Sequence, residues 1–320
     1  MLSQLVTSTS LYARAIPLHW YPDTFGGGPN APVASDMLFE QTVTVEAAAP
    51  LALKVHFKLT HNGVDAHFNA TQELPAVYVN SAYTTLAYYT GSDPWNNAPL
   101  TETLAPVNGG VPDSVQVYAP EQWAARVDSN GQGLSVFAPG QYPGVTATSY
   151  PGAGGAGPLG DATVYMRPMA WLTVAPGAVI ESDVYLAPGD VRAARAAIYA
   201  LHASLPPTDF ATSIATVDTP TANSVVAGTN VSVAGWAFDN LAVETVNVYV
   251  DGVLSGTASL GGARPDVAAA YPDLAPVNCG WSYSLDSTRL VNGSHSLAIR
   301  VRDTSDNEAW LVPIPIVVSN

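Results

Sequence analysis

The run Leu53-Lys54-Val55-His56-Phe57-Lys58-Leu59 alternates strictly between apolar and polar residues. Successive side chains of a strand point to opposite faces, so this run predicts a half-buried strand with its apolar residues toward a core. Asn62-Gly63 follows directly, and this dipeptide favours a hairpin turn. Residues 72–80 then predict a returning apolar strand, with Pro75 at an edge or a bulge. The whole segment is typical of a β-sheet protein.

Composition extends this prediction to the rest of the chain. Of 320 residues, 48% are hydrophobic and only 12% are charged, against roughly 25% charged in an ordinary globular protein. A chain this apolar can bury a core, which excludes intrinsic disorder. The 26 glycines and 26 prolines break the chain into short segments, which favours strands over long helices. The length predicts about two domains.

Charge and cysteine content exclude several classes of function. The net charge is −15, so we expect no nucleic acid or anionic lipid partner. No run of about 18 apolar residues occurs, so no membrane span is expected. Cys279 is the single cysteine, which rules out an intramolecular disulfide and a cysteine-based zinc site.

Short strands with turn residues between them are predicted in both halves of the chain. In the first half they cover residues 39–45, 115–118, 133–137, 163–166 and 180–186, and in the second half 231–235, 246–250, 281–285, 297–301 and 313–318. Asp251-Gly252 predicts a hairpin, and the glycine-rich residues 152–160 predict a loop. Five short strands in the last 100 or so residues are typical of a β-sandwich.

One helix is predicted at Val191 to Ala203, because its apolar residues recur at helical spacing and Asp190 can cap it. Pro206-Pro207 ends it and favours an extended linker. We therefore expect an all-β chain made of a β-sandwich domain at residues 1–204 with one short C-terminal helix, a linker at 205–213 and a second β-sandwich at 214–320.

The second domain resembles bacterial Ig-like modules over residues 214–320. The resemblance rests on spaced motifs: Gly235-Trp236-Ala237-Phe238-Asp239-Asn240, Val246 to Gly252, Arg264-Pro265-Asp266-Val267, Leu290 to His295 and Arg302-Asp303. Such modules are appended to large secreted and cell-surface proteins, including enzymes that degrade polysaccharides. The resemblance implies a spacer or interaction module without chemistry of its own, attached to other domains of a larger protein.

The first domain resembles, more faintly, the β super-sandwich of galactose mutarotase-like carbohydrate-active domains. The resemblance rests on the strand at Leu53 to Leu59, its Asn62-Gly63 turn and the return strand from Gln72 to Val79. The catalytic histidine of mutarotases is not matched, since Gln72, Glu73 and Pro75 stand there, so no catalytic residue is carried over. Such domains are usually longer, which favours a chain beginning partway through one. This would also explain why Met1 to Ser10 lacks the features of a signal peptide.

His61, Asp65, His67 and Glu73 are close together in the sequence and all have odd numbers. A regular strand places Asp65, His67 and Glu73 on one face. Imidazoles and carboxylates are suitable ligands of zinc or another divalent ion and also form acid–base pairs. The alternatives are solvated polar residues, a sugar-binding cluster, or a divalent metal site at His61, Asp65 and His67. A calcium site in the second domain would use Asp239, Asn240, Asp303, Asp306 and Asn307, which Asx turns explain equally well.

Glycoside hydrolysis needs two carboxylates, and three candidates stand beside aromatic or apolar residues. Glu73 precedes an apolar strand, and Glu121 and Asp128 flank Trp123. Aromatic rings stack on sugar rings, while amide side chains bind hydroxyl groups. The predicted substrate-binding residues are Gln72, Tyr78, Tyr89, Trp95 and Trp123.

These observations lead to two hypotheses. The first is an acidic, secreted or cell-surface bacterial protein that acts on or binds a polysaccharide, with glycosidase chemistry if it is an enzyme. The second is a non-catalytic adhesive or structural surface protein. A cleft with two close carboxylates would favour the first, and carboxylates scattered over solvated faces would favour the second.

Overall fold

A computed structural model describes residues 1–18, 33–73, 76–104, 107–108, 111–141, 144–150, 163–206, 209, 211–272 and 274–320. Within its strands, the side chains of residues 69–73, 107–108, 111–114, 148–150 and 169–172 lie outside this description. The chain forms two compact units. The first comprises residues 1–66, 73–169 and 175–209, and the second comprises residues 67–72, 170–174 and 210–320.

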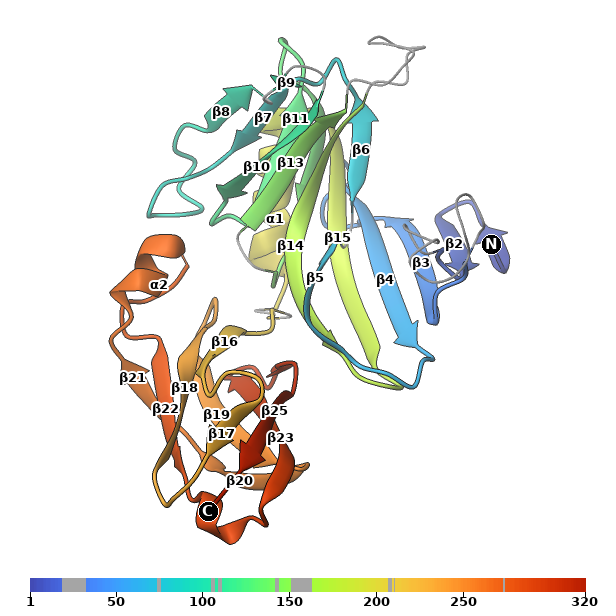
Figure 1. Cartoon of the computed structure of the whole chain (residues 1–320). Helices are drawn as coiled ribbons and strands as arrows, with labels where there is room; N and C mark the ends of the chain where they lie inside the picture. The colour runs from blue at the N-terminus through green and yellow to red at the C-terminus, as the bar shows by residue number, and fades with distance from the viewer. Residues whose placement is uncertain are drawn as a thin grey trace. The chain divides into compact units, whose positions relative to one another are not determined.

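A nine-stranded antiparallel sheet is the main element of the first unit (Figure 1). Its order is β1(Ser3–Val6), β2(Ser10–Ala15), β3(Met37–Val45), β4(Leu53–His61), β15(Val179–Asp190), β12(Gln132–Phe137), β11(Trp123–Val127), β7(Thr85–Tyr88) and β8(Thr101–Leu104). The alternating run at Leu53 to Leu59 lies within β4, as its pattern predicts. Its Val55 and Phe57 are buried, while Lys54, His56 and Lys58 are half-buried.

A second sheet contains β5(His67–Glu73), β14(Thr163–Val174), β13(Gly144–Tyr150), β10(Val111–Tyr118) and β9(Val107–Asn108) in that order, with β6(Val77–Asn80) paired to β14. Apolar side chains of both sheets form one core, in which Val55 and Val184 meet Val145, Ala147 and Met166. This buried apolar surface holds the two sheets together as a sandwich.

The helix α1(Val191–Ser204) packs on the other face of the nine-stranded sheet. Asp190 caps it by accepting the backbone N–H groups of Arg192 and Ala193, as expected from the sequence. Its buried residues Ile198 and Leu201 belong to a core that also contains Trp123 of β11 and Tyr185 of β15. The central strands are thus covered on both faces, and every residue of β11 is buried.

The hairpin predicted at Asn62-Gly63 is wrong. β4 pairs with β3 on one side and β15 on the other, so neither of its edges is free for the strand that follows. The chain instead leaves the nine-stranded sheet after His61 and enters the other sheet as β5. Asp65 therefore lies in the connection and not on a strand. The predicted loop at 152–160 lies outside the described residues.

Residues 214–318 of the second unit form a sandwich of two sheets around one apolar core. One sheet contains β16(Ile214–Thr219), β18(Val231–Phe238), β22(Gly280–Leu285) and β21(Ser259–Gly262). The other contains β17(Ser224–Val226), β25(Ile314–Val318), β23(Gly293–Asp303), β19(Val243–Val250) and β20(Val253–Thr257), with β24(Glu308–Trp310) paired to β23. A short helix α2(Pro265–Ala270) and a 3-10 turn at Ser287–Arg289 complete it. The mostly-β class predicted from the sequence is confirmed.

The predicted hairpin at Asp251-Gly252 joins β19 to β20, and both turn residues have positive φ. Asp251 also binds His295 at the start of β23, with Oδ2 at 2.6 Å from Nδ1. The other ring nitrogen of His295 donates to the carbonyl of Val291 at 2.8 Å. Both partners are acceptors, so they raise the pKa of His295 above 6.5 despite burial. The fold therefore favours the imidazolium form of His295.

Truncation of the helix core tests the packing of α1. We expect Ile198→Ala to lower the free energy of unfolding of the first unit by about 2–5 kcal/mol, because it leaves a cavity in place of a fully buried side chain. Arg192→Ala, at an exposed position of the same helix, should change it by less than about 0.5 kcal/mol. Urea denaturation followed by circular dichroism measures both, and equal effects would contradict the packing described.

The His295 pair predicts a pH dependence of stability. A raised folded-state pKa contributes stability below the unfolded value of 6.5, and this contribution is lost as pH rises through the folded value. The difference in urea midpoint between the wild type and His295→Gln should therefore be larger at pH 6 than at pH 9. A difference that does not change with pH would show that folding does not raise the pKa of His295.

Candidate functional site

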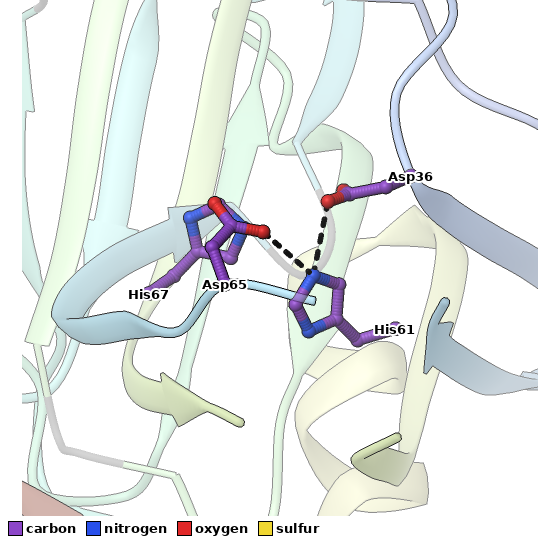
Figure 2. Close-up of side chains that lie close together, drawn as sticks. All are labelled: Asp36, His61, Asp65 and His67. Carbon is purple, nitrogen blue, oxygen red and sulfur yellow. Dashed lines mark hydrogen bonds and ion pairs between the residues drawn. The ribbon is translucent and has the colours of Figure 1, made fainter. Parts of the chain in front are cut away.

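Four side chains gather where the chain passes from β4 to β5 (Figure 2). They are Asp36, just before β3, His61 at the end of β4, Asp65 in the connection, and His67 at the start of β5. Each offers one nitrogen or oxygen atom, and these four atoms lie within 4.8 Å of one another. We call these residues the His61 cluster. It contains the three residues that the sequence predicts as metal ligands, together with Asp36.

His61 is the centre of the cluster. Its side chain is fully buried, and its Nδ1 lies 2.9 Å from the carbonyl oxygen of Ala175. A carbonyl only accepts, so Nδ1 carries the proton, and Nε2 faces the carboxylates of Asp36 at 3.1 Å and Asp65 at 3.7 Å. Burial lowers the pKa of His61, but the Ala175 carbonyl and the two carboxylates raise it by more, so the pKa lies above its ordinary value.

Register places Asp36 in this cluster. β3 and β4 pair with Met37 opposite His61, and the backbone N–H of Asn62 donates to the Asp36 carbonyl at 2.8 Å. Asp36 is far from the other three in the sequence, so local spacing could not identify it. Only the pairing of β3 with β4 brings Asp36 next to His61.

Gly63 fits closely against the same atoms. A Cβ atom at this position would lie 2.1 Å from Oδ2 of Asp36 and 2.5 Å from Nε2 of His61. Cβ contacts are essentially never this short, so a larger residue at position 63 would force the side chains of Asp36 and His61 to shift.

The fully buried Glu121 is the centre of a second network. Its Oε1 accepts from the backbone of Trp95 at 3.0 Å, from Arg195 at 3.1 Å and from the hydroxyl of Tyr199 at 2.5 Å. Its Oε2 accepts the indole N–H of Trp123 at 2.8 Å. Burial and the Glu121 carboxylate raise the pKa of Tyr199. The network fastens α1 to the loop before β8.

Most of the predicted substrate-binding aromatics belong to this second network. Trp95 stacks on His202 at a centroid distance of 3.6 Å, and the guanidinium of Arg195 lies over the ring of Tyr89, 5.9 Å from its centroid. Trp123 is fully buried. Arg195, Tyr199 and His202 of α1, which the sequence did not single out, supply the partners of these residues.

The remaining predicted residues are spread over the first unit. Asp128 lies in the turn between β11 and β12, where the backbone N–H groups of Gln132 and Asn130 lower its pKa. Tyr78 is exposed and stacks on Tyr165 at 5.1 Å. The side chains of Gln72 and Glu73 lie outside the described residues.

Two carboxylates of the predicted calcium site in the second unit also come together, since oxygen atoms of Asp239 and Asp303 lie within 4.8 Å. Asp303 accepts the backbone N–H groups of Ser305 and Asn307. Asp239 accepts that of Leu241. These are Asx-type turn contacts, and calcium there stays a prediction.

A third arrangement covers the outer face of the nine-stranded sheet. Cross-strand pairing aligns Arg14, Glu40, Lys58 and Glu181 in one row, and Tyr12, Thr42, His56 and Asp183 in the next. Lys54 lies beside the second row, bound to Asp183 at 2.6 Å. We call these nine residues the polar sheet face. It carries both lysines of the chain.

Salt bridges and hydrogen bonds order the polar sheet face. His56 lies 2.8 Å from Asp183, and Lys58 lies 3.0 Å from Glu181. The hydroxyl of Tyr12 donates to Glu40 at 2.5 Å. The side chains of Lys54, His56, Lys58, Glu181 and Asp183 keep 31% to 48% of their surface exposed, so a ligand from solvent can reach them.

The bacterial Ig domain family matches residues 214–299. The C-terminal part of the chain therefore contains an Ig-like domain, as its motifs predict. No curated protein matches the chain. Among the described residues, no helix is both long and apolar enough to cross a membrane.

Several solved structures are distantly similar. The fibronectin type III-like modules of Clostridium thermocellum CbhA are 12% identical over 33% of this chain and 94% of that chain, with a TM-score of 0.24. An endo-β-1,4-mannanase from Thermotoga petrophila is 17% identical over 38% of this chain and 23% of its own, with a TM-score of 0.25. A Klebsiella pneumoniae protein assigned as an aldose 1-epimerase is 10% identical over 65% and 60%, with a TM-score of 0.33. Since these TM-scores are low, the function must be argued from the chain's own residues.

Removal of the Glu121 charge tests the role of the buried network. We expect Glu121→Gln to lower the free energy of unfolding by about 3–5 kcal/mol, because it leaves the buried Arg195 guanidinium without its anion. The exposed Glu102→Gln is the matched control and should change it by less than about 0.5 kcal/mol. Denaturant unfolding of the full chain measures both variants, and a stable Glu121→Gln protein would argue against a structural carboxylate.

Proposed function

We propose that the protein binds a polysaccharide through the polar sheet face and that it does so outside the cell. The observation that carries this proposal is the alignment of hydrogen-bonding side chains across four adjacent strands, β2, β3, β4 and β15. Four strands span about 14 Å at the usual spacing of a sheet. This is an extended surface, suited to a chain-like ligand.

The chemistry of the polar sheet face suits sugar hydroxyl groups. A hydroxyl both donates and accepts, and the face offers carboxylate acceptors in Glu40, Glu181 and Asp183 beside ammonium donors in Lys54 and Lys58. Hydrogen bonds to charged groups are stronger than those between neutral groups. Tyr12 adds an aromatic ring on the same face. The side chains already bind one another, so little conformational entropy remains to be lost on binding.

Binding is favoured over glycoside hydrolysis by the surroundings of the predicted acids. Glu121 is buried with four protein donors, and Asp128 is bound within a turn. Hydrolysis would need a proton-transferring carboxylate and a second one that faces the substrate. Catalysis by Glu73, Glu121 or Asp128 therefore stays a prediction, and the proposal is for a binding protein. The Ig-like domain supports an extracellular location and an accessory or spacer role.

Affinity electrophoresis in gels that contain neutral or uronic-acid polysaccharides tests this proposal. We expect the wild type to be retarded by at least one polysaccharide. The double variant His56→Ala/Lys58→Ala should weaken binding at least tenfold, because it removes two adjacent donors from the centre of the face. Folding should persist, since surface ion pairs contribute about 1 kcal/mol or less.

Arg289→Ala in the second unit is the control, because Arg289 is 84% exposed and lies outside the polar sheet face. It should bind as the wild type does. Equal retardation of the double variant and the wild type would remove the face from the binding site. No retardation by any polysaccharide would favour the adhesive or structural alternative.

A further inference from the structure

We propose that the His61 cluster is a zinc site, with Asp36, His61, Asp65 and His67 as its four ligands. This inference is independent of polysaccharide binding, because the cluster shares no residue with the polar sheet face. Two imidazole nitrogens and two carboxylate oxygens are a donor set that zinc accepts readily.

The orientation of His61 suits a metal ligand. Its Nδ1–H is held by the carbonyl of Ala175 at 2.9 Å, which directs Nε2 toward the carboxylates. Histidine ligands of metals usually donate their second ring N–H to a carbonyl or carboxylate in this way, which fixes the ring before the metal arrives. The backbone of His61 is fixed as well, because its N–H donates to the carbonyl of Ala178 at 2.9 Å and its carbonyl accepts from Gly177 at 3.1 Å.

The distances between donor atoms fit a tetrahedral ion. Zinc ligands at 2.0–2.1 Å from the metal lie about 3.3–3.4 Å from one another in a tetrahedron. The distances from Nε2 of His61, 3.1 Å to Asp36 and 3.7 Å to Asp65, lie on either side of that value. All four donor atoms lie within 4.8 Å of one another. Small rotations of these side chains would therefore bring them to the corners of a tetrahedron around one ion.

Gly63 brings the connection between the strands close to two of the donor atoms. The connection between β4 and β5 passes so close to Asp36 and His61 that a Cβ at residue 63 would overlap both donor atoms. The side chains of Asp36 and Asp65 remain 35% and 64% exposed. An ion therefore has a path of entry into the site.

Donor type separates zinc from calcium. Calcium takes six to eight oxygen ligands, whereas half of the donors here are imidazole nitrogens. A bound zinc ion would join the start of β3, the end of β4 and the start of β5. It would therefore fasten the point at which the chain passes from one sheet to the other.

The test is a zinc titration of the full chain after removal of metal with a chelator, monitored with a chromophoric zinc indicator that competes for the ion. We expect one tight site per chain and a rise in melting temperature when zinc is added. Asp36→Asn and Asp65→Asn keep the shape of the side chain at partly exposed positions, so both variants should fold. Each should raise the zinc dissociation constant at least tenfold and reduce the rise in melting temperature.

His56→Gln/Asp183→Asn is the matched control, because His56 and Asp183 also form a close imidazole–carboxylate pair, at 2.8 Å, but lie on the polar sheet face. This control should bind zinc as the wild type does. Equal zinc affinity in the wild type and in both Asp→Asn variants, or no tight site in the wild type, would overturn the proposal. Tight binding of calcium in place of zinc would overturn the identity of the ion.

Discussion

The first unit depends on one sheet that packs against a different neighbour on each face. The nine-stranded sheet has the six-stranded sheet on one face, and α1 covers the central strands of the other face. β11 lies where both faces are covered, and all of its residues are buried, including Arg126. Burial lowers the pKa of Arg126 to about 10. β4 lies where only one face is covered, so it alternates between buried and half-buried residues.

This difference explains which parts of the fold could be predicted from the sequence. The alternation of apolar and polar residues directly indicates a half-buried strand, so β4 could be predicted from the run Leu53 to Leu59. Strands buried on both faces have no alternation, and the polar residues around β11 instead suggested a ligand-binding cluster. The turn at Asp251-Gly252 was predictable because a hairpin turn is local. The turn at Asn62-Gly63 was not, because the hydrogen-bonding edges of β4 are taken by β3 and β15, which are distant in the sequence.

The same limit applies to the candidate sites. His61, Asp65 and His67 are near one another in the sequence, so the sequence could predict that their side chains lie close together. Asp36 lies beside them only because of the register in which β3 pairs with β4. Tyr89, Trp95, Glu121 and Trp123 also meet, but α1 supplies Arg195 and Tyr199 to bury them. Sequence identifies residues that are capable of binding. Tertiary packing decides whether their polar atoms are turned to solvent or to one another.

Both proposed sites depend on the register of β4. Lys54, His56 and Lys58 have even positions and point to the outer face, while His61 has the same parity as the buried Val55 and Phe57. A slip of one residue would move every side chain to the opposite face. It would put lysines into the core and His61 outside the reach of Asp36. Pairing along the whole length of β4 with both β3 and β15 opposes such a slip, so the contacts that form the sandwich core also keep the polar sheet face and the His61 cluster in place.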